Sequence, residues 1–123
     1  MTVKSMAYDR NNIFARILRG EIPCTKVYED EHVLAFRDIE PQAPTHIVLI
    51  PKGEYVSVDD FSATGSDVEL AGFMRAIAKI AKAEGIAEPG YRILSNHGKA
   101  ARQTVPHFHL HLFAGRDLGA MLP

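Results

Sequence analysis

Tryptophan is absent from this chain of 123 residues, and cysteine occurs once, as Cys24. A single cysteine cannot form a disulfide within the chain, and it excludes zinc sites built from pairs of cysteines. The longest uninterrupted apolar runs are four residues, as at 47–50, far short of the roughly 20 residues that a membrane-spanning helix needs. We therefore expect a protein of a reducing compartment, located in the cytoplasm and without a membrane partner.

Neither sign of charge dominates, because 14 Lys and Arg stand against 15 Asp and Glu and give a formal net charge of −1. Dispersed charge of this kind lacks the basic stripe that nucleic-acid binding requires, so we expect no nucleic-acid partner. The hydrophobic and charged fractions, 46% and 24%, are typical of one globular domain. We expect that domain over residues 11–123, after a flexible N-terminal segment 1–10 that lacks the apolar core of a secretion signal.

Hydrophobic spacing predicts two helices and five strands. Asn12 can cap a short helix that ends at Gly20, and Ser66 with Glu69 forms a capping box before a long amphipathic helix that ends near Gly85. Strands are predicted at 26–29, 32–36, 45–50, 91–95 and 105–113. Because consecutive strands follow without crossover helices, we predict an α+β domain, a five-stranded, mainly antiparallel sheet with the helices on one face.

Three histidines alternate with apolar residues in the last predicted strand: His107, His109 and His111. Side chains alternate between the faces of a sheet, so the three imidazoles are expected on one face at intervals of about 6.6 Å. Neighbouring imidazoles disfavour one another's protonation unless an anion or a metal ion gathers them. The pattern therefore indicates a site for a negatively charged group or a metal.

Two kinds of site fit this cluster. Three neutral imidazoles can coordinate zinc and leave a fourth position for water, although no Asp or Glu lies between Tyr91 and Arg116 to act as a local partner of the ligands. Alternatively, one neutral imidazole attacks a phosphorus atom while its neighbours hold the phosphate oxygens and protonate the leaving group. The second kind needs no metal or other cofactor, and His109, the middle member, is best placed as the nucleophile.

Further blocks resemble the histidine triad (HIT) family, and specifically its Hint branch of nucleoside phosphoramidases. They are 12–14 with Ile17, 21–23, 35–39, 41–46, 90–92, Asn96, 103–105 and 107–116, and they follow the family order from residue 11 to residue 116. The resemblance implies an HIT-like fold whose sheet extends across a homodimer. It also implies a metal-independent hydrolase that binds purine nucleotides of the AMP or GMP type.

The reaction implied by the resemblance cleaves the P–N bond of nucleoside 5′-monophosphoramidates, or aminoacyl adenylates, and releases the nucleoside monophosphate. His109 is similar to the nucleophile that forms a covalent nucleotidyl-histidine intermediate. His111 resembles the residue that contacts the phosphate and assists the leaving group, and His107 and His46 resemble supporting members that orient and relay protons. A dinucleoside polyphosphate hydrolase and a nucleotide-binding regulatory or scaffold protein remain alternatives.

The substrate-binding residues come from the same resemblance. Asp38 is similar to a carboxylate that binds the ribose hydroxyls, and Asn96, Gln103 and Thr104 belong to a loop that contacts the phosphate and the leaving group. The purine pocket is expected to be lined by Ile13, Phe14, Ile17, Ile22, Phe36, Ile39 and Val48. Spacing alone favours a core role for the three apolar residues at 13, 14 and 17 and a turn for Asp38. The chain departs from the family at Arg102, where glycine is usual, and in a tail, 116–123, that lacks tryptophan.

Overall fold

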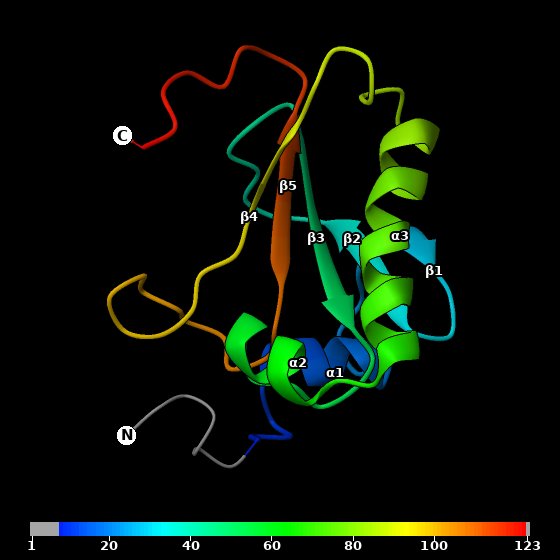
Figure 1. Cartoon of the computed structure of the whole chain (residues 1–123), viewed down its shortest axis with the longest axis vertical. Coiled ribbons are helices and arrows are strands. Elements are labelled where there is room, and N and C mark those ends of the chain that lie inside the picture. The colour runs from blue at the N-terminus through cyan, green and yellow to red at the C-terminus, as the bar shows by residue number, and fades with distance from the viewer. Residues whose placement is uncertain (1–7, 123) are drawn as a thin grey trace.

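The computed structural model describes residues 8–122, and within them five strands form one antiparallel sheet (Figure 1). The strands are β1 (Lys26–Glu29), β2 (Val33–Arg37), β3 (Thr45–Pro51), β4 (Arg92–Leu94) and β5 (Leu110–Ala114). They lie in the order β1-β2-β3-β5-β4, and every neighbouring pair is antiparallel. The α+β architecture expected from the sequence is confirmed.

The described part of the chain has three helices rather than the two expected: α1 (Ile13–Leu18), α2 (Val58–Thr64) and α3 (Asp67–Ala83). Asn12 caps α1, and Ser66 with Glu69 closes the capping box of α3, as predicted. Helix α2 was not predicted. It has seven residues and buries only Phe61, so its sequence has no periodic spacing of hydrophobic residues. Within residues 8–122 no helix has the length and apolar character needed to cross a membrane.

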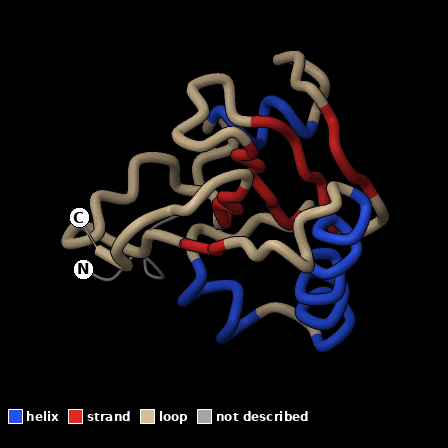
Figure 2. Tube along the Cα trace, turned by 90° about the horizontal axis from the view of Figure 1, so that it is seen from above, coloured by secondary structure: helices blue, strands red, loops and turns tan. Residues whose placement is uncertain are grey.

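The helices cover both faces of the sheet, so the expectation that they share one face is wrong. Helix α1 packs against Leu34, Phe36, Val48 and Ile50, whereas α2 and α3 pack against the opposite face, which carries Val33, Ala35, Ile47 and Leu49. Figure 2 shows blue helices on both sides of the red strands. Strands β2 and β3 are buried nearly throughout for this reason, which a sheet covered on both faces requires.

The final strand is shorter than predicted, because β5 begins at Leu110 and not at residue 105. The backbone before it bonds outside the sheet: Phe108 N–H donates to the Tyr55 carbonyl, and the Ser95 hydroxyl donates to the His109 carbonyl. The side chains of 107–112 nevertheless alternate, since Phe108, Leu110 and Leu112 enter the core beneath α3. His107 and His109 therefore lie in an extended segment just outside the sheet.

A row of residues in register crosses the sheet on the face that carries α1. Phe36 of β2 lies opposite Val48 of β3, Val48 opposite His111 of β5, and His111 opposite Leu94 of β4. Residues opposite each other in antiparallel strands project from the same face. This register brings His111 between an apolar cluster under α1 on one side and β4 on the other.

Candidate active site

His107 is fully buried and both of its ring nitrogens are occupied. Its Nε2 lies 2.9 Å from the Pro51 carbonyl, and its Nδ1 contacts the Tyr8 hydroxyl. A carbonyl can only accept a hydrogen bond, so Nε2 carries the proton and Nδ1 accepts from Tyr8. With both nitrogens engaged in this way, His107 cannot join His109 and His111 in a zinc site of three imidazoles.

His109 is oriented by the backbone of His107. Its Nδ1 lies 2.8 Å from the His107 carbonyl, so Nδ1–H is the donor and Nε2 presents a free lone pair. Phe14 of α1 packs edge-on against the ring, with 4.9 Å between ring centroids. The imidazole is thus fixed in the tautomer that a nucleophile requires.

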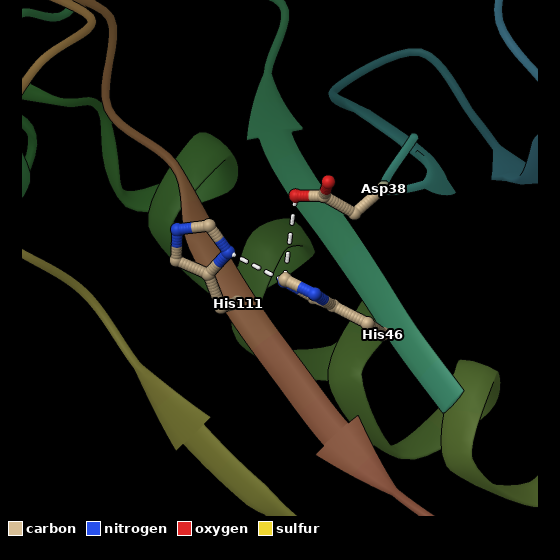
Figure 3. Close-up of side chains that lie close together, drawn as sticks. All are labelled: Asp38, His46 and His111. Atoms are coloured by element: carbon tan, nitrogen blue, oxygen red, sulfur yellow. Dashed lines mark hydrogen bonds and ion pairs between the residues drawn. The ribbon is translucent and has the colours of Figure 1, made fainter. Parts of the chain in front are cut away.

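His111 is oriented by a second chain of hydrogen bonds, and Figure 3 shows its link between His46 and His111. The Gln42 backbone N–H donates to His46 Nδ1 at 3.1 Å, and His46 Nε2 lies 2.9 Å from His111 Nδ1. Because Gln42 occupies Nδ1 as a donor, His46 carries its proton on Nε2 and donates it to His111. Neutral His111 therefore holds its own proton on Nε2.

His109 and His111, which lie two residues apart on the same face, thus have opposite tautomers. The ring centroids of His109 and His111 are 5.2 Å apart. One ring offers a lone pair at Nε2 and the other offers an N–H at Nε2. One ring can thus attack an electrophilic centre while the other donates a proton to the group that leaves it.

Burial keeps the imidazoles of the site neutral. Burial, together with the neighbouring His109, lowers the pKa of His107 and of His111 to about 4. The pKa values of His109 and His46 are also lowered, mainly by burial, while the charge of Asp38 partly opposes the shift. Neutral rings favour a nucleophilic role for His109 near pH 7.

Asp38 supplies a carboxylate near the histidines. The sequence did not indicate this proximity, because Asp38 is about 70 residues away from the three clustered histidines along the chain. Its Oδ2 is 3.5 Å from His46 Nε2. Asp38, His46 and His111 each offer one ligand atom, and these atoms lie within 4.8 Å of one another. A metal ion bound by His46 Nε2 would have to move that proton to Nδ1, where it would face the Gln42 N–H, so the hydrogen-bond chain fits these residues better than a metal does.

Most of the apolar residues expected around a purine gather on one face of the sheet. Phe14 and Ile17 of α1 pack against Phe36 and Val48, and Ile22 joins Ile17 in lining a cavity of about 260 Å³ at the β1 side. The two others, Ile13 and Ile39, are 43% and 90% exposed and stand outside this cluster. The structure therefore unites four of the seven residues in one cluster, places Ile22 in the cavity beside it and leaves Ile13 and Ile39 at the surface.

The loop between β4 and β5 is held by Gln103. Its Oε1 accepts from the Gly98 N–H, and its Nε2 donates to the carbonyls of Val56 and Val105. The side-chain amide thus shapes the loop, whereas Asn96 is half-buried and Thr104 exposed. Arg102 has a φ of 58°, the left-handed region that glycine favours, so the loop keeps the backbone conformation of a glycine despite the substitution.

Three contributors were missed by the sequence argument, namely Tyr8, Gln42 and Ser95. Tyr8 belongs to the segment 1–10 that was expected to be flexible; residues 1–7 lie outside the described residues, but the Tyr8 hydroxyl donates to His107. Gln42 acts through its backbone N–H, and Ser95 bonds the carbonyl of His109. Backbone donors and contacts across the fold leave no mark in a sequence pattern.

The HIT domain family matches residues 19–118, a range that contains Asp38, His46 and the three clustered histidines. The chain belongs to the HIT domain family. This HIT protein is 65% identical over 115 residues to an uncharacterized 13.2 kDa HIT-like protein of Azospirillum brasilense, with 94% of each chain covered. The resemblance noted in the sequence is confirmed at the level of the family.

Two further similarities concern relatives whose names state an activity. The HIT protein is 50% identical over 110 residues to the purine nucleoside phosphoramidase of Escherichia coli K12, covering 89% of this chain and 92% of the relative. The solved structure of a HIT family hydrolase from Clostridium thermocellum superposes with a TM-score of 0.84 at 41% identity, covering 94% of this chain and 99% of that one. The family of this chain thus includes hydrolases.

Proposed function

We propose that the chain is a purine nucleoside phosphoramidase, which hydrolyses the P–N bond of nucleoside 5′-monophosphoramidates and releases the nucleoside monophosphate. The observation that carries the proposal is the pair of opposite tautomers at His109 and His111. The name of the Escherichia coli relative supports the same substrate class.

In the first proposed step, His109 Nε2 attacks phosphorus and the P–N bond breaks, so that the nucleotide becomes bonded to His109. The hydrogen bond from His109 Nδ1–H to the His107 carbonyl is kept. The carbonyl oxygen stabilises the positive charge that develops on the ring. The amine leaves as it takes a proton from His111 Nε2, and the hydrogen bond from His46 Nε2–H to His111 Nδ1 stabilises the ring that has lost its proton. Water then cleaves the P–N bond to His109, gives the nucleoside monophosphate and returns a proton to His111.

The nucleoside is proposed to lie across the sheet toward α1. The half-buried Phe14 would contact the purine, with the buried Phe36 and Val48 behind it. Asp38, beside His46, would accept hydrogen bonds from the ribose hydroxyls. In the strand register Phe36 lies opposite Val48, and Val48 lies opposite His111, so these apolar residues adjoin His111. Base, ribose and phosphate then follow the row from β2 to β5.

We expect protein treated with EDTA to turn over an adenosine 5′-phosphoramidate, because each proposed step uses only imidazoles and water. Steady-state hydrolysis of a fluorogenic adenosine tryptamine phosphoramidate measures this, with a diadenosine polyphosphate as the competing substrate. Faster turnover of the polyphosphate, or activity only after zinc is added, would contradict the proposal. Nucleotide binding without turnover of either compound would favour a regulatory binding protein.

Replacement of Tyr8 with Phe is expected to lower kcat about fivefold while leaving KM nearly unchanged, since one hydrogen bond contributes about 1 kcal/mol. The hydroxyl fixes the tautomer of His107, whose carbonyl orients His109, and the phenyl ring keeps the edge-on packing against His107. Nitrogen-15 NMR of the His107 ring should report the lost bond. Tyr28→Phe, which loses a bond to Asp30 at the β1–β2 turn, is the matched control, and equal kcat values for the two variants would overturn this role of Tyr8.

We also propose a homodimer in which two sheets join through β4. The two edges of the sheet differ: β1 carries the Lys26–Glu29 ion pair, a charge pattern that discourages strand pairing, whereas Ile93 and Leu94 of β4 are 44% and 37% exposed. Sedimentation equilibrium should give twice the 13.6 kDa mass of the chain. Ile93→Lys should shift the protein toward monomer and the exposed Ile39→Lys should not; a monomeric wild-type protein at micromolar concentration would refute the dimer.

A further inference from the structure

The three residues after β4 lie outside the sheet, next to the candidate active site. Strand β4 ends at Leu94, and β5 begins only at Leu110. Residues 95–97 therefore have no ladder of strand hydrogen bonds to hold them. A turn follows at once, because Gly98 has a φ of 76°, in the left-handed region that glycine favours. Side-chain contacts must then fix the position of these three residues.

The first of these contacts keeps the segment beside His109. Leu94 lies opposite His111 in antiparallel register. Continued by two residues, this register places Asn96 opposite His109, and residues opposite each other project from the same face. The Ser95 hydroxyl donates to the His109 carbonyl at 2.7 Å, so the two segments stay adjacent beyond the end of β4. Asn96 is therefore expected on the side of the sheet that carries the two imidazoles.

Asn96 is half-buried, and the protein does not engage its amide. Among residues 8–122 its side chain takes part in no hydrogen bond, although both of its neighbours do. A side-chain amide has two N–H donors and a carbonyl acceptor. A phosphate at His109 would offer oxygens to those donors, in agreement with the phosphate contact that the resemblance implies for Asn96.

His97, the next residue, is anchored at the start of α2. Its Nδ1 lies 2.8 Å from the hydroxyl oxygen of Ser57, which is 1% exposed and caps α2. Helix α2 packs through Phe61 against the face of the sheet opposite to α1. Successive side chains of an extended chain alternate in direction. The bond that holds His97 toward α2 therefore favours the orientation of Asn96 toward the imidazoles.

The residues just before α2 hold the loop between β4 and β5 at both of its ends. Gln103, in the later part of the loop, donates to the carbonyl of Val56, and the adjacent Ser57 contacts His97. In Figure 1 the loop runs away from β4 and returns to β5 beside α2. Only the contact at His97 depends on side chains from both partners, so a single substitution at either residue removes it.

We propose that His97 is a positioning residue, whose bond to Ser57 holds the Asn96 amide against the phosphate while His109 attacks. This inference rests on the proposed phosphoramidase function, and the bonds that form and break are those of the proposed reaction. A donor that is already in place stabilises the transition state better than one that must first be ordered. Loss of the bond therefore lowers kcat more than it raises KM.

His97→Phe, which keeps an aromatic ring but removes the nitrogen, tests the proposal. For adenosine tryptamine phosphoramidate we expect kcat to fall about tenfold, as for a weakened hydrogen bond to a charged group, with KM changed less than about twofold. His97→Asn, whose amide can take the position of Nδ1, should restore most of the rate. Because His97 acts through Asn96, His97→Phe should lower kcat less than about twofold in an Asn96→Ala background.

His32→Phe is the matched control, because His32 is half-buried at the turn between β1 and β2, away from the loop. It should leave kcat within about twofold of the wild-type value. Equal kcat values for His97→Phe and the wild-type protein would overturn the inference and leave the phosphoramidase proposal intact. A tenfold fall that persists in the Asn96→Ala background would also overturn it, because His97 would then act by another route.

A binding measurement tests the inference without turnover. Addition of AMP should shift the side-chain amide resonances of Asn96 in the wild-type protein and shift them much less in His97→Phe. Equal shifts in the two proteins would contradict the positioning role. Failure of the wild-type protein to hydrolyse the phosphoramidate would count against the proposed function itself, and the amide resonances would still decide whether His97 places Asn96 at the phosphate.

Discussion

His109→Ala is expected to lower turnover of an adenosine phosphoramidate by at least about a thousandfold, because the variant loses the atom that forms the covalent intermediate. The hydrogen bonds of His107 and of the His46–His111 pair do not depend on the His109 ring. Binding of the nucleoside monophosphate should therefore change far less than turnover. Single-turnover assays with excess enzyme measure the rate of hydrolysis, and calorimetric titration with AMP measures nucleotide binding.

His32→Ala is the control for His109→Ala. His32 is half-buried at the turn between β1 and β2, beside Gly72 of α3. Its loss should leave kcat within about twofold of the wild-type value, because it lies away from the site. Mass spectrometry of the acid-quenched wild-type reaction should detect one added nucleotidyl group, which His109→Ala should lack. Turnover by His109→Ala at a tenth of the wild-type rate would overturn the nucleophilic role.

Acidification is expected to cost the protein stability through His107. In the unfolded chain this imidazole has its ordinary pKa of 6.5, whereas burial lowers the pKa in the folded protein to about 4. Between these values the unfolded chain binds a proton that the folded chain does not, so the free energy of unfolding falls as the pH decreases from 6.5 to about 4. The full difference corresponds to about 3 kcal/mol for this group.

Urea titrations at a series of pH values, with His107→Gln alongside, measure this contribution. Glutamine has no proton to gain in this range, so the variant should lose about 3 kcal/mol less than the wild-type protein between pH 7 and pH 4. The remaining pH dependence comes from other groups, including His111, whose pKa is lowered in the same direction. Parallel curves for the two proteins would show that His107 does not titrate as its burial implies.

The fold was predictable from the sequence wherever one element carried its own signal. The capping box at Ser66 and the periodic apolar residues after it marked α3, and the apolar run at 47–50 marked β3. Helix α2 was missed because a single buried residue, Phe61, gives no period. The face on which each helix packs depends on contacts between distant segments, which is why the helices were wrongly expected to share one face.

The candidate site was predictable in composition and only partly in geometry. The alternation at 107–111 correctly placed the histidines and the apolar residues on opposite sides. The tautomers of His109 and His111 could not be foreseen, because backbone groups of His107 and Gln42 set them. The assignments of nucleophile, ribose carboxylate and phosphate loop remain predictions that the experiments above address.

The dependence of those tautomers on main-chain atoms has a consequence for how such proteins can diverge. Beside the side chains of Tyr8 and His46, three main-chain groups hold the imidazoles. They are the carbonyls of Pro51 and His107 and the N–H of Gln42, which side-chain substitutions other than proline leave in place. Residues around the purine surface can therefore change while His109 and His111 keep their tautomers. One chemical step can thus be inherited intact by descendants that differ in what they recognise.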